Sequence, residues 1–190
     1  MRCKALNHFE LEVKAKVKDK QKLFSFFLNN GWRVFKYSVE DVYFSHPCRN
    51  FDVGEELRYR RERIGEKERI LLTYKRGKIA TQRLEIEAEV SDEIIIILEN
   101  LGFKKELSKV KDGFLFTKDN LKAVLVSVSG CYKDKWVNLG DFLEVEILAN
   151  ERDKRIVREL EEFVLSLPGI SGIDNEFYAK KIIRIATDIE

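Results

Sequence analysis

Residues 9–17 alternate strictly between apolar and charged side chains, and no other feature restricts the fold of this chain as strongly. The apolar positions are Phe9, Leu11, Val13, Ala15 and Val17, and glutamate or lysine fills every gap. Because successive side chains of a β-strand point to opposite faces, this pattern predicts a strand with one buried and one charged face. The alternation recurs at 57–60, 83–90 and 142–147, and we expect further strands at 69–76, 103–111, 114–118 and 121–129.

Amphipathic helices are expected between the strands. Asp19 and Ser91 can each cap a helix at its N-terminus. A period of 3.6 residues over 156–164 predicts a third helix, and Asp174 can begin a fourth. These elements predict an α+β protein with a meandering antiparallel sheet of about eight strands. The spacing leaves two arrangements open: an open sheet with charged faces in water, or a closed barrel whose charged interior requires a charged ligand.

The composition restricts the class of protein. With 190 residues, 44% apolar and 36% charged, and no linker-like segment, the chain suits one folded domain over residues 1–190. A net charge of +2 does not fit a globally basic nucleic-acid binder. The apolar runs are far shorter than the roughly 20 residues that cross a bilayer, and the chain begins with charge rather than an apolar signal segment. We therefore expect a cytoplasmic protein, with neither a membrane nor a nucleic acid as partner, and leave a homodimer open.

The cysteines and histidines predict no site of their own. Three cysteines at unrelated spacings (Cys3, Cys48 and Cys131) fit neither a disulfide framework nor a zinc cluster, so we expect reduced thiols. His8 and His46 are too few for a histidine metal site. His46 and Cys48 flank a proline, where an ordinary loop is a better interpretation than a nucleophile with its base.

Paired glutamates occupy the charged faces of three expected strands. They are Glu10 and Glu12, Glu85 and Glu87, and Glu144 and Glu146. Residues i and i+2 of a strand lie roughly 6.5–7 Å apart on one face, so two carboxylates so placed can converge on one divalent cation. A solvated strand face is the alternative interpretation, because Glu66 and Glu68 have the same spacing in an ordinary loop.

Basic residues accompany these acids on strands of the same kind. They are Lys14, Arg58, Arg60, Lys75, Arg83, Lys109 and Lys111, and Asp134 adds a seventh acid to the six glutamates. A polyphosphate–metal complex needs both basic and acidic side chains, since the bases neutralise phosphate oxygens and the acids hold the metal. We therefore expect acidic and basic side chains from distant segments to meet around a shared hollow.

The order of these motifs resembles the CYTH superfamily, also called triphosphate tunnel metalloenzymes. The resemblance begins at Phe9-Glu10-Leu11-Glu12-Val13-Lys14 and continues through Asp41-Val42-Tyr43-Phe44, Leu57-Arg58-Tyr59-Arg60, Leu72-Thr73-Tyr74-Lys75, Arg83-Leu84-Glu85-Ile86-Glu87, Lys109-Val110-Lys111, Asp134 and Phe142-Leu143-Glu144-Val145-Glu146. The group includes class IV adenylyl cyclases and thiamine triphosphatases. The resemblance thus covers residues 9–146 of this chain.

The resemblance implies an eight-stranded antiparallel closed β-barrel with helices packed outside and a triphosphate in its tunnel. It implies Mg²⁺ or Mn²⁺ at Glu10, Glu12, Glu85, Glu87, Asp134, Glu144 and Glu146. It implies phosphate contacts by Lys14, Arg58, Arg60, Lys75, Arg83, Lys109 and Lys111, with Lys14 and Lys75 as the catalytic cations. The sequence departs from the family at Lys111, where an arginine is usual, and at Trp136, which replaces a small aliphatic residue.

Four functions are consistent with these residues. With water as the nucleophile, the chain is a triphosphatase for inorganic, nucleoside or thiamine triphosphate, and we favour this hypothesis because it requires the fewest features. With the ribose 3′-hydroxyl of ATP as the nucleophile, it is a class IV adenylyl cyclase that releases pyrophosphate. A third hypothesis is a non-catalytic polyphosphate- or nucleotide-binding module. In the fourth, the charged faces are merely solvated.

Overall fold

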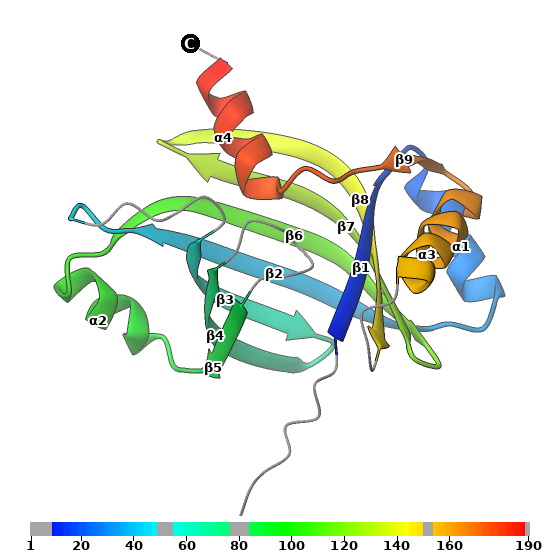
Figure 1. Ribbon diagram of the computed structural model, residues 1–190, viewed down its shortest axis with the longest axis horizontal. Coiled ribbons are helices and arrows are strands. Elements are labelled where there is room, and N and C mark those ends of the chain that lie inside the picture. Colours follow the sequence, from blue (N-terminus) through cyan, green and yellow to red (C-terminus); the bar gives the residue numbers. More distant parts are fainter. Residues whose placement is uncertain (1–8, 49–54, 77–83, 150–153, 189–190) are drawn as a thin grey trace, which may run out of the picture. The chain divides into compact units, whose positions relative to one another are not determined.

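The computed structural model describes residues 9–48, 55–76, 84–149 and 154–188 (Figure 1). Its elements, in chain order, are β1 (Phe9–Val17), α1 (Lys20–Asn29), β2 (Arg33–Ser45), β3 (Glu56–Ile64), β4 (Lys67–Arg76), β5 (Leu84–Glu89), α2 (Glu93–Asn100), β6 (Lys104–Lys118), β7 (Leu121–Tyr132), β8 (Lys135–Ala149), α3 (Lys154–Ser166), β9 (Ile170–Ile173) and α4 (Tyr178–Asp188). This confirms the predicted α+β class.

The strands form one hydrogen-bonded sheet in the order β5-β4-β3-β2-β6-β7-β8-β1-β9. The predictions of eight strands and of a closed barrel were wrong for the described residues, because the sheet has nine strands and ends at β5 and β9 without a hydrogen-bonded closure. The extra end strand, β9, pairs antiparallel with Ala15, Lys16 and Val17 of β1.

Two differences in the strand pattern explain the wrong count. The segments 103–111 and 114–118 form a single strand, β6, because Asp112-Gly113 lies inside the strand and does not make a turn. Two strands were not predicted: β2, and the short β9 with its sequence Ile-Ser-Gly-Ile. A strand of four residues that contains a glycine carries no clear period.

The helix boundaries agree with the sequence at α1 and differ at α2 and α4. The Asp19 side chain accepts a hydrogen bond from the Lys22 backbone N–H at 3.0 Å, which confirms the predicted cap. At α2 the cap position is Asp92 rather than Ser91, and Asp92 makes no side-chain cap bond. Its carboxylate is instead bonded to Tyr59 and Arg61. Asp174 does not begin the last helix, because α4 starts at Tyr178.

The chain divides into two compact units, which we describe separately. The first comprises residues 1–35, 114–126 and 141–175. Its core lies between the sheet and two helices: Val13 of β1 and Val145 of β8 pack with Phe27 of α1 and Val164 of α3. Figure 1 shows α1 and α3 side by side next to β1 and β9. Because Val13 and Val145 face these helices, the alternate residues Glu12, Lys14, Glu144 and Glu146 occupy the opposite face.

The second unit comprises residues 36–113, 127–140 and 176–190. Leu98 of α2 packs on Phe44 of β2 and Tyr59 of β3, and partly buried apolar residues surround this cluster. The helix therefore covers one face of β2, β3 and β4. The other face of these strands carries polar and charged side chains.

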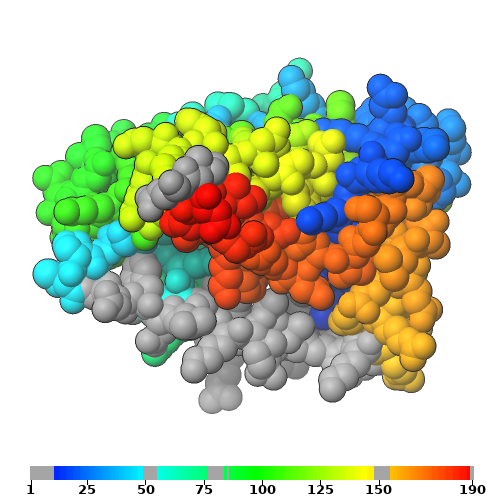
Figure 2. All heavy atoms as spheres, turned by 90° about the horizontal axis from the view of Figure 1, so that it is seen from above, coloured from blue at the N-terminus to red at the C-terminus, as the bar shows by residue number. Residues whose placement is uncertain are grey.

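Helix α4 belongs to the second unit and packs on β7 at Gly130. A Cβ atom added to Gly130 would lie 2.3 Å from Ile182 Cδ1 and 2.6 Å from the Ser108 carbonyl oxygen, so only glycine permits this approach. Figure 2 shows α4, in red, against the yellow-green strands. No helix in the described part of the chain is long and apolar enough to span a membrane.

Candidate functional site

The face of β2–β5 that lies opposite α2 gathers many of the predicted phosphate-binding residues. In the antiparallel register, Asp41 of β2 faces Arg60 of β3, and Tyr43 faces Arg58. Residues that face each other share one face of the sheet, so these four side chains lie together. The same face continues through Thr73 and Lys75 of β4 to Glu87 of β5, as the register shows. The alternation read from the sequence therefore identified the correct face for Arg58, Arg60 and Lys75.

Asp41 lies at the centre of this face and is 1% exposed. Its carboxylate accepts hydrogen bonds from Arg60 Nε at 2.7 Å and Arg60 Nη2 at 3.1 Å. Lys109 Nζ of β6 lies 2.7 Å from Asp41 Oδ2, and Arg58 Nε lies 3.6 Å from Asp41 Oδ1. One buried carboxylate thus holds three cations; we call Asp41, Arg58, Arg60 and Lys109 the basic cluster.

Two tyrosine rings enclose the cation of Lys109. Lys109 Nζ donates a hydrogen bond to the Tyr43 hydroxyl at 3.0 Å. It also lies 5.5 Å from the ring centre of Tyr178, the first residue of α4. Lys111 Nζ lies 5.1 Å from the centre of the same ring. Helix α4 therefore brings an aromatic face to both β6 lysines, an arrangement that favours their charged forms.

The basic cluster has more positive than negative charge. Arg58 is 6% exposed and Lys109 4% exposed, and both share Asp41 with Arg60. Three cations against one carboxylate leave an excess of two positive charges. In the described part of the chain, the buried Nε of Arg58 has no hydrogen-bond partner. Buried cations without a matching anion are costly, so this site favours an added anion.

The pKa shifts follow from the same geometry. Burial alone would raise the pKa of Asp41, but the charges of Lys109, Arg58 and Arg60 outweigh it and hold that pKa well below its usual range. Burial would likewise lower the pKa of Lys109, but the Asp41 carboxylate outweighs burial and the pKa is raised. All four groups of the basic cluster are therefore ionised at neutral pH.

The predicted acidic pairs on β1 and β8 lie in the first unit. Glu12 faces Glu146, and Lys14 faces Glu144, so these four side chains share one face as predicted. Lys122 of β7 donates to Glu146 Oε1 at 2.9 Å. Asp174 Oδ1 lies 3.8 Å from Lys14 Nζ, and the Asp174 backbone N–H donates to the Lys14 carbonyl oxygen at 2.7 Å.

The remaining predicted residues are placed as follows. Glu87 is exposed and accepts a hydrogen bond from Thr73 Oγ1 at 3.2 Å. Asp134 is exposed in the turn between β7 and β8, where its φ is 63°. Arg83 and the side chains of Glu10 and Glu85 lie outside the described residues. Among the side chains that are described, no three His, Cys, Asp or Glu gather closely enough to hold a metal ion, so the metal set stays a prediction.

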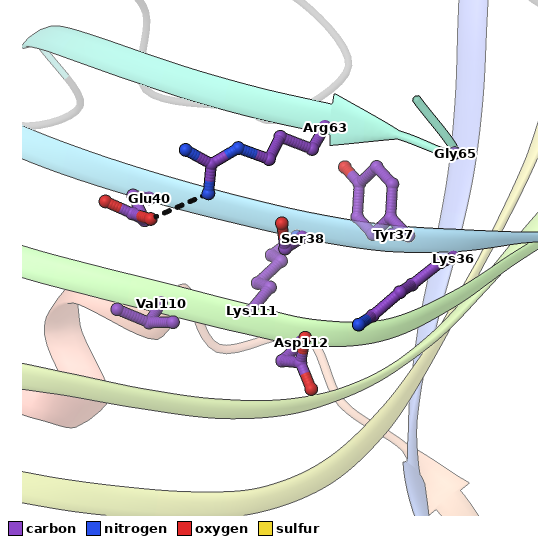
Figure 3. Close-up of a pocket in the computed structure, with 9 residues that line it drawn as sticks. All are labelled: Lys36, Tyr37, Ser38, Glu40, Arg63, Gly65, Val110, Lys111 and Asp112. Carbon is purple, nitrogen blue, oxygen red and sulfur yellow. Dashed lines mark hydrogen bonds and ion pairs between the residues drawn. The ribbon is translucent and has the colours of Figure 1, made fainter. Parts of the chain in front are cut away.

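A cavity of about 500 Å³ lies in the second unit (Figure 3). It is lined by β2, β6 and the end of β3, and its charged residues are Lys36, Arg63, Lys111, Glu40 and Asp112. Arg63 Nη1 lies 3.5 Å from Glu40 Oε1, as the dashed line in the figure marks. None of the four residues of the basic cluster is among the residues that line this cavity. Its mixed charges do not favour a polyanion.

Sequence reasoning gave no role in these sites to Asp41, Tyr43, Tyr178 and Asp174, although Asp41 and Tyr43 belong to a motif of the resemblance. Asp41 does carry a signal, because a charge at a position where the alternation of β2 requires burial indicates a buried ion pair. Tyr178 and Asp174 carry no such signal. Their roles depend on where α4 and the segment after β9 pack, and the local sequence does not determine this.

The fold and the site together define a class of protein. It has an antiparallel α+β fold, and its site contains buried arginine and lysine side chains in excess of carboxylates. The CYTH domain model matches residues 8–176, and the chain therefore belongs to the CYTH family. No curated protein is significantly similar to the chain.

Solved structures share the fold of this chain. The PH1819 protein of Pyrococcus horikoshii OT3 is 30% identical, with a TM-score of 0.75, and the match covers 93% of this chain and 99% of that one. A Vibrio parahaemolyticus protein named "putative adenylate cyclase" is 20% identical, with a TM-score of 0.63, over 93% and 98% of the two chains. HpAC1 from Hippeastrum, described as having a dominant triphosphatase activity, is 14% identical, with a TM-score of 0.58, over 93% and 95%. The last two show the fold alone.

Proposed function

We propose that this protein is a divalent-metal-dependent phosphoryl-transfer enzyme that hydrolyses a triphosphate-containing substrate. The observation that carries the proposal is the basic cluster, in which the buried Arg58 and Lys109 and the partly buried Arg60 share one buried carboxylate. A triphosphate supplies the missing negative charge and several acceptor oxygens at once. Membership of the CYTH family supports the proposal, and so does the activity described for HpAC1.

In phosphoryl transfer, the basic cluster positions the phosphates and neutralises their charge. Charge builds on the transferred group and on the leaving phosphate, so catalysis depends on positioning and neutralisation. The buried Arg58 Nε is available to donate to a phosphate oxygen, and Arg60 presents a second guanidinium beside it. Guanidinium groups bind phosphate through two parallel hydrogen bonds, which orients as well as neutralises it.

Carboxylates of the first unit have the right chemistry for a metal ion. Glu12 and Glu146 face each other across β1 and β8, and Glu144 lies on the same face. Oxygen ligands of this kind suit Mg²⁺ or Mn²⁺. A bound ion would polarise phosphate oxygens and neutralise part of their charge. The assignment of Glu10, Glu85, Glu87 and Asp134 to the metal, and of Lys14 and Lys75 to catalysis, stays a prediction from the resemblance.

A class IV adenylyl cyclase is the second candidate, since a structural relative is named "putative adenylate cyclase". Both reactions need the same neutralised phosphates, and they differ in the nucleophile. A cyclase requires the ATP ribose to be held with its 3′-hydroxyl in line with the α-phosphorus. Hydrolysis requires only a water molecule there, which is why we favour it.

Product identification tests the proposal. The purified protein is incubated with inorganic triphosphate, ATP and thiamine triphosphate, with Mg²⁺ or Mn²⁺ and with a chelator. Orthophosphate release that requires the metal supports the triphosphatase. Cyclic AMP with pyrophosphate supports the cyclase instead, and metal-dependent turnover of none of the substrates contradicts both.

Two arginines of β3 provide a matched comparison. Arg58 belongs to the basic cluster, whereas Arg63 is exposed and paired with Glu40 and Glu68. Arg58→Gln is expected to weaken triphosphate binding roughly 10- to 100-fold, because charged hydrogen bonds contribute about 1.5–3 kcal/mol each. Arg63→Gln should leave binding almost unchanged. Equal effects of the two substitutions would place the phosphate site elsewhere.

A further inference from the structure

We propose that Asp41 is an internal counter-ion that competes with the triphosphate for the cations of the basic cluster. This makes Asp41 a positioning residue that sets the affinity of the site, and the inference rests on the proposed function. The resemblance described above includes the motif Asp41-Val42-Tyr43-Phe44, but it assigned no role to Asp41 and only phosphate contacts to the cations around it.

The Asp41 carboxylate occupies donors that a phosphate would use. It takes Nε and Nη2 of Arg60, at 2.7 and 3.1 Å, and the ammonium of Lys109 at 2.7 Å. Carboxylate and phosphate oxygens make the same charge-assisted hydrogen bonds to these groups. Asp41 therefore holds the basic cluster in place without a ligand, and it also reduces the positive charge that a ligand meets.

Removal of this charge has opposite consequences for folding and for binding. In an Asp41→Asn variant, Arg58, Arg60 and Lys109 lose their shared carboxylate while Arg58 and Lys109 stay buried, which destabilises the protein. A bound triphosphate restores the missing negative charge, so the variant gains more from the ligand than the wild type does. By thermodynamic linkage, the variant binds triphosphate more tightly. A purely structural role predicts the opposite, since a disorganised site binds more weakly.

The same competition affects turnover. A site with its full positive charge also binds inorganic phosphate products more tightly, so their release slows. Asp41→Asn is therefore expected to lower KM and kcat together. Loss of packing or of arginine orientation would raise KM while it lowers kcat.

Calorimetric titration with inorganic triphosphate, in a metal-free buffer with chelator, tests the inference without catalysis. We expect Asp41→Asn to bind roughly 5- to 100-fold more tightly than the wild type, the range typical of coupling between two sites. The control is Glu62→Gln. Glu62 is a carboxylate of β3 that is 5% exposed, but its partners are Tyr37 and Arg69 rather than the basic cluster. This variant should bind like the wild type.

The outcomes separate the two proposals. If the wild type binds triphosphate neither with chelator nor with Mg²⁺, the proposed function fails. If the wild type binds and Asp41→Asn binds equally or more weakly, the counter-ion inference is wrong and the proposed function stands. Should Asp41→Asn not fold by itself, circular dichroism is measured with millimolar triphosphate. We expect the ligand to restore the fold, and a chain that stays unfolded in triphosphate contradicts the inference.

Discussion

Asp41 shows how burial and charge together fix the state of a single residue. Removing a carboxylate from water favours its neutral form, yet Lys109, Arg58 and Arg60 lie close enough to reverse that preference and keep the pKa low. The folded protein thus retains a negative charge at a position that is 1% exposed. The cost of burial is offset only while all the partners remain charged.

This depressed pKa predicts how stability depends on pH. A carboxyl group whose pKa is lower in the folded than in the unfolded state stabilises the fold above its unfolded pKa of about 3.9, and this contribution is lost as the pH falls through the folded pKa. The difference in unfolding free energy between wild type and Asp41→Asn should therefore be constant from pH 5 to 8, at about 3–5 kcal/mol, and shrink in acid. Urea titrations at several pH values measure it. A difference that grows in acid would contradict the account.

At the residue scale, the sequence predicted that Arg58 and Arg60 share a face, but it did not predict the residues that pair with these cations. Arg58 and Arg60 are two residues apart on an alternating strand, so a common face followed directly from the pattern. The link from Asp41 to Lys109 depends on the pairing of β2 with strands far apart in the sequence, which alternation does not specify. Asp174 resembled a helix cap because aspartate favours caps and loops for the same reason, namely local hydrogen bonding to the backbone.

At the scale of elements, the pairing of β1 with β8 brings like charges together. Glu12 and Glu146 face each other, and Lys122 bonds to Glu146. Directly opposed like charges are unfavourable on a strand pair. A divalent cation with both carboxylates as ligands would remove the repulsion, so under the proposed function metal binding should stabilise the folded protein.

Glu12→Gln tests this pair of strands. We expect Mg²⁺ or Mn²⁺ to raise the melting temperature of the wild type and to raise that of Glu12→Gln much less, because one ligand is weakened. Differential scanning fluorimetry across a metal titration provides the measurement. Glu159→Gln, an exposed glutamate of α3, is the control and should respond like the wild type. An equal response of all three proteins would exclude Glu12 as a ligand.

The packing of α4 on β7 gives a second prediction at this scale. Gly130→Ala would place a methyl group 2.3 Å from Ile182 Cδ1 and 2.6 Å from the Ser108 carbonyl oxygen. Side chains can shift, but the strand backbone cannot easily do so, and overpacking of this kind costs typically about 1–3 kcal/mol. We expect a lower unfolding free energy and faster proteolysis of α4. Ser129→Ala is the control on the same strand, and an unchanged stability of Gly130→Ala would show that α4 does not pack here.

At the scale of the whole chain, the α+β class was predicted and the number of strands was not. The alternation of β1, β3 and β8 is sufficient to identify an antiparallel sheet with one charged face. The short β9 and the long β6 could not be inferred, since Gly113 resembles a turn residue and yet lies within a strand. The family resemblance was not affected by the wrong number of strands, because it depends on the order of the motifs along the chain.

The central claim is that the excess positive charge around Asp41 is a binding site for the phosphates of the substrate. A crystal structure of the protein with inorganic triphosphate tests it most directly. We expect phosphate oxygens within hydrogen-bond distance, about 3 Å, of the Arg58 and Arg60 guanidinium groups. A triphosphate bound instead in the cavity beside Lys36 and Arg63, with the basic cluster unchanged, would contradict the claim.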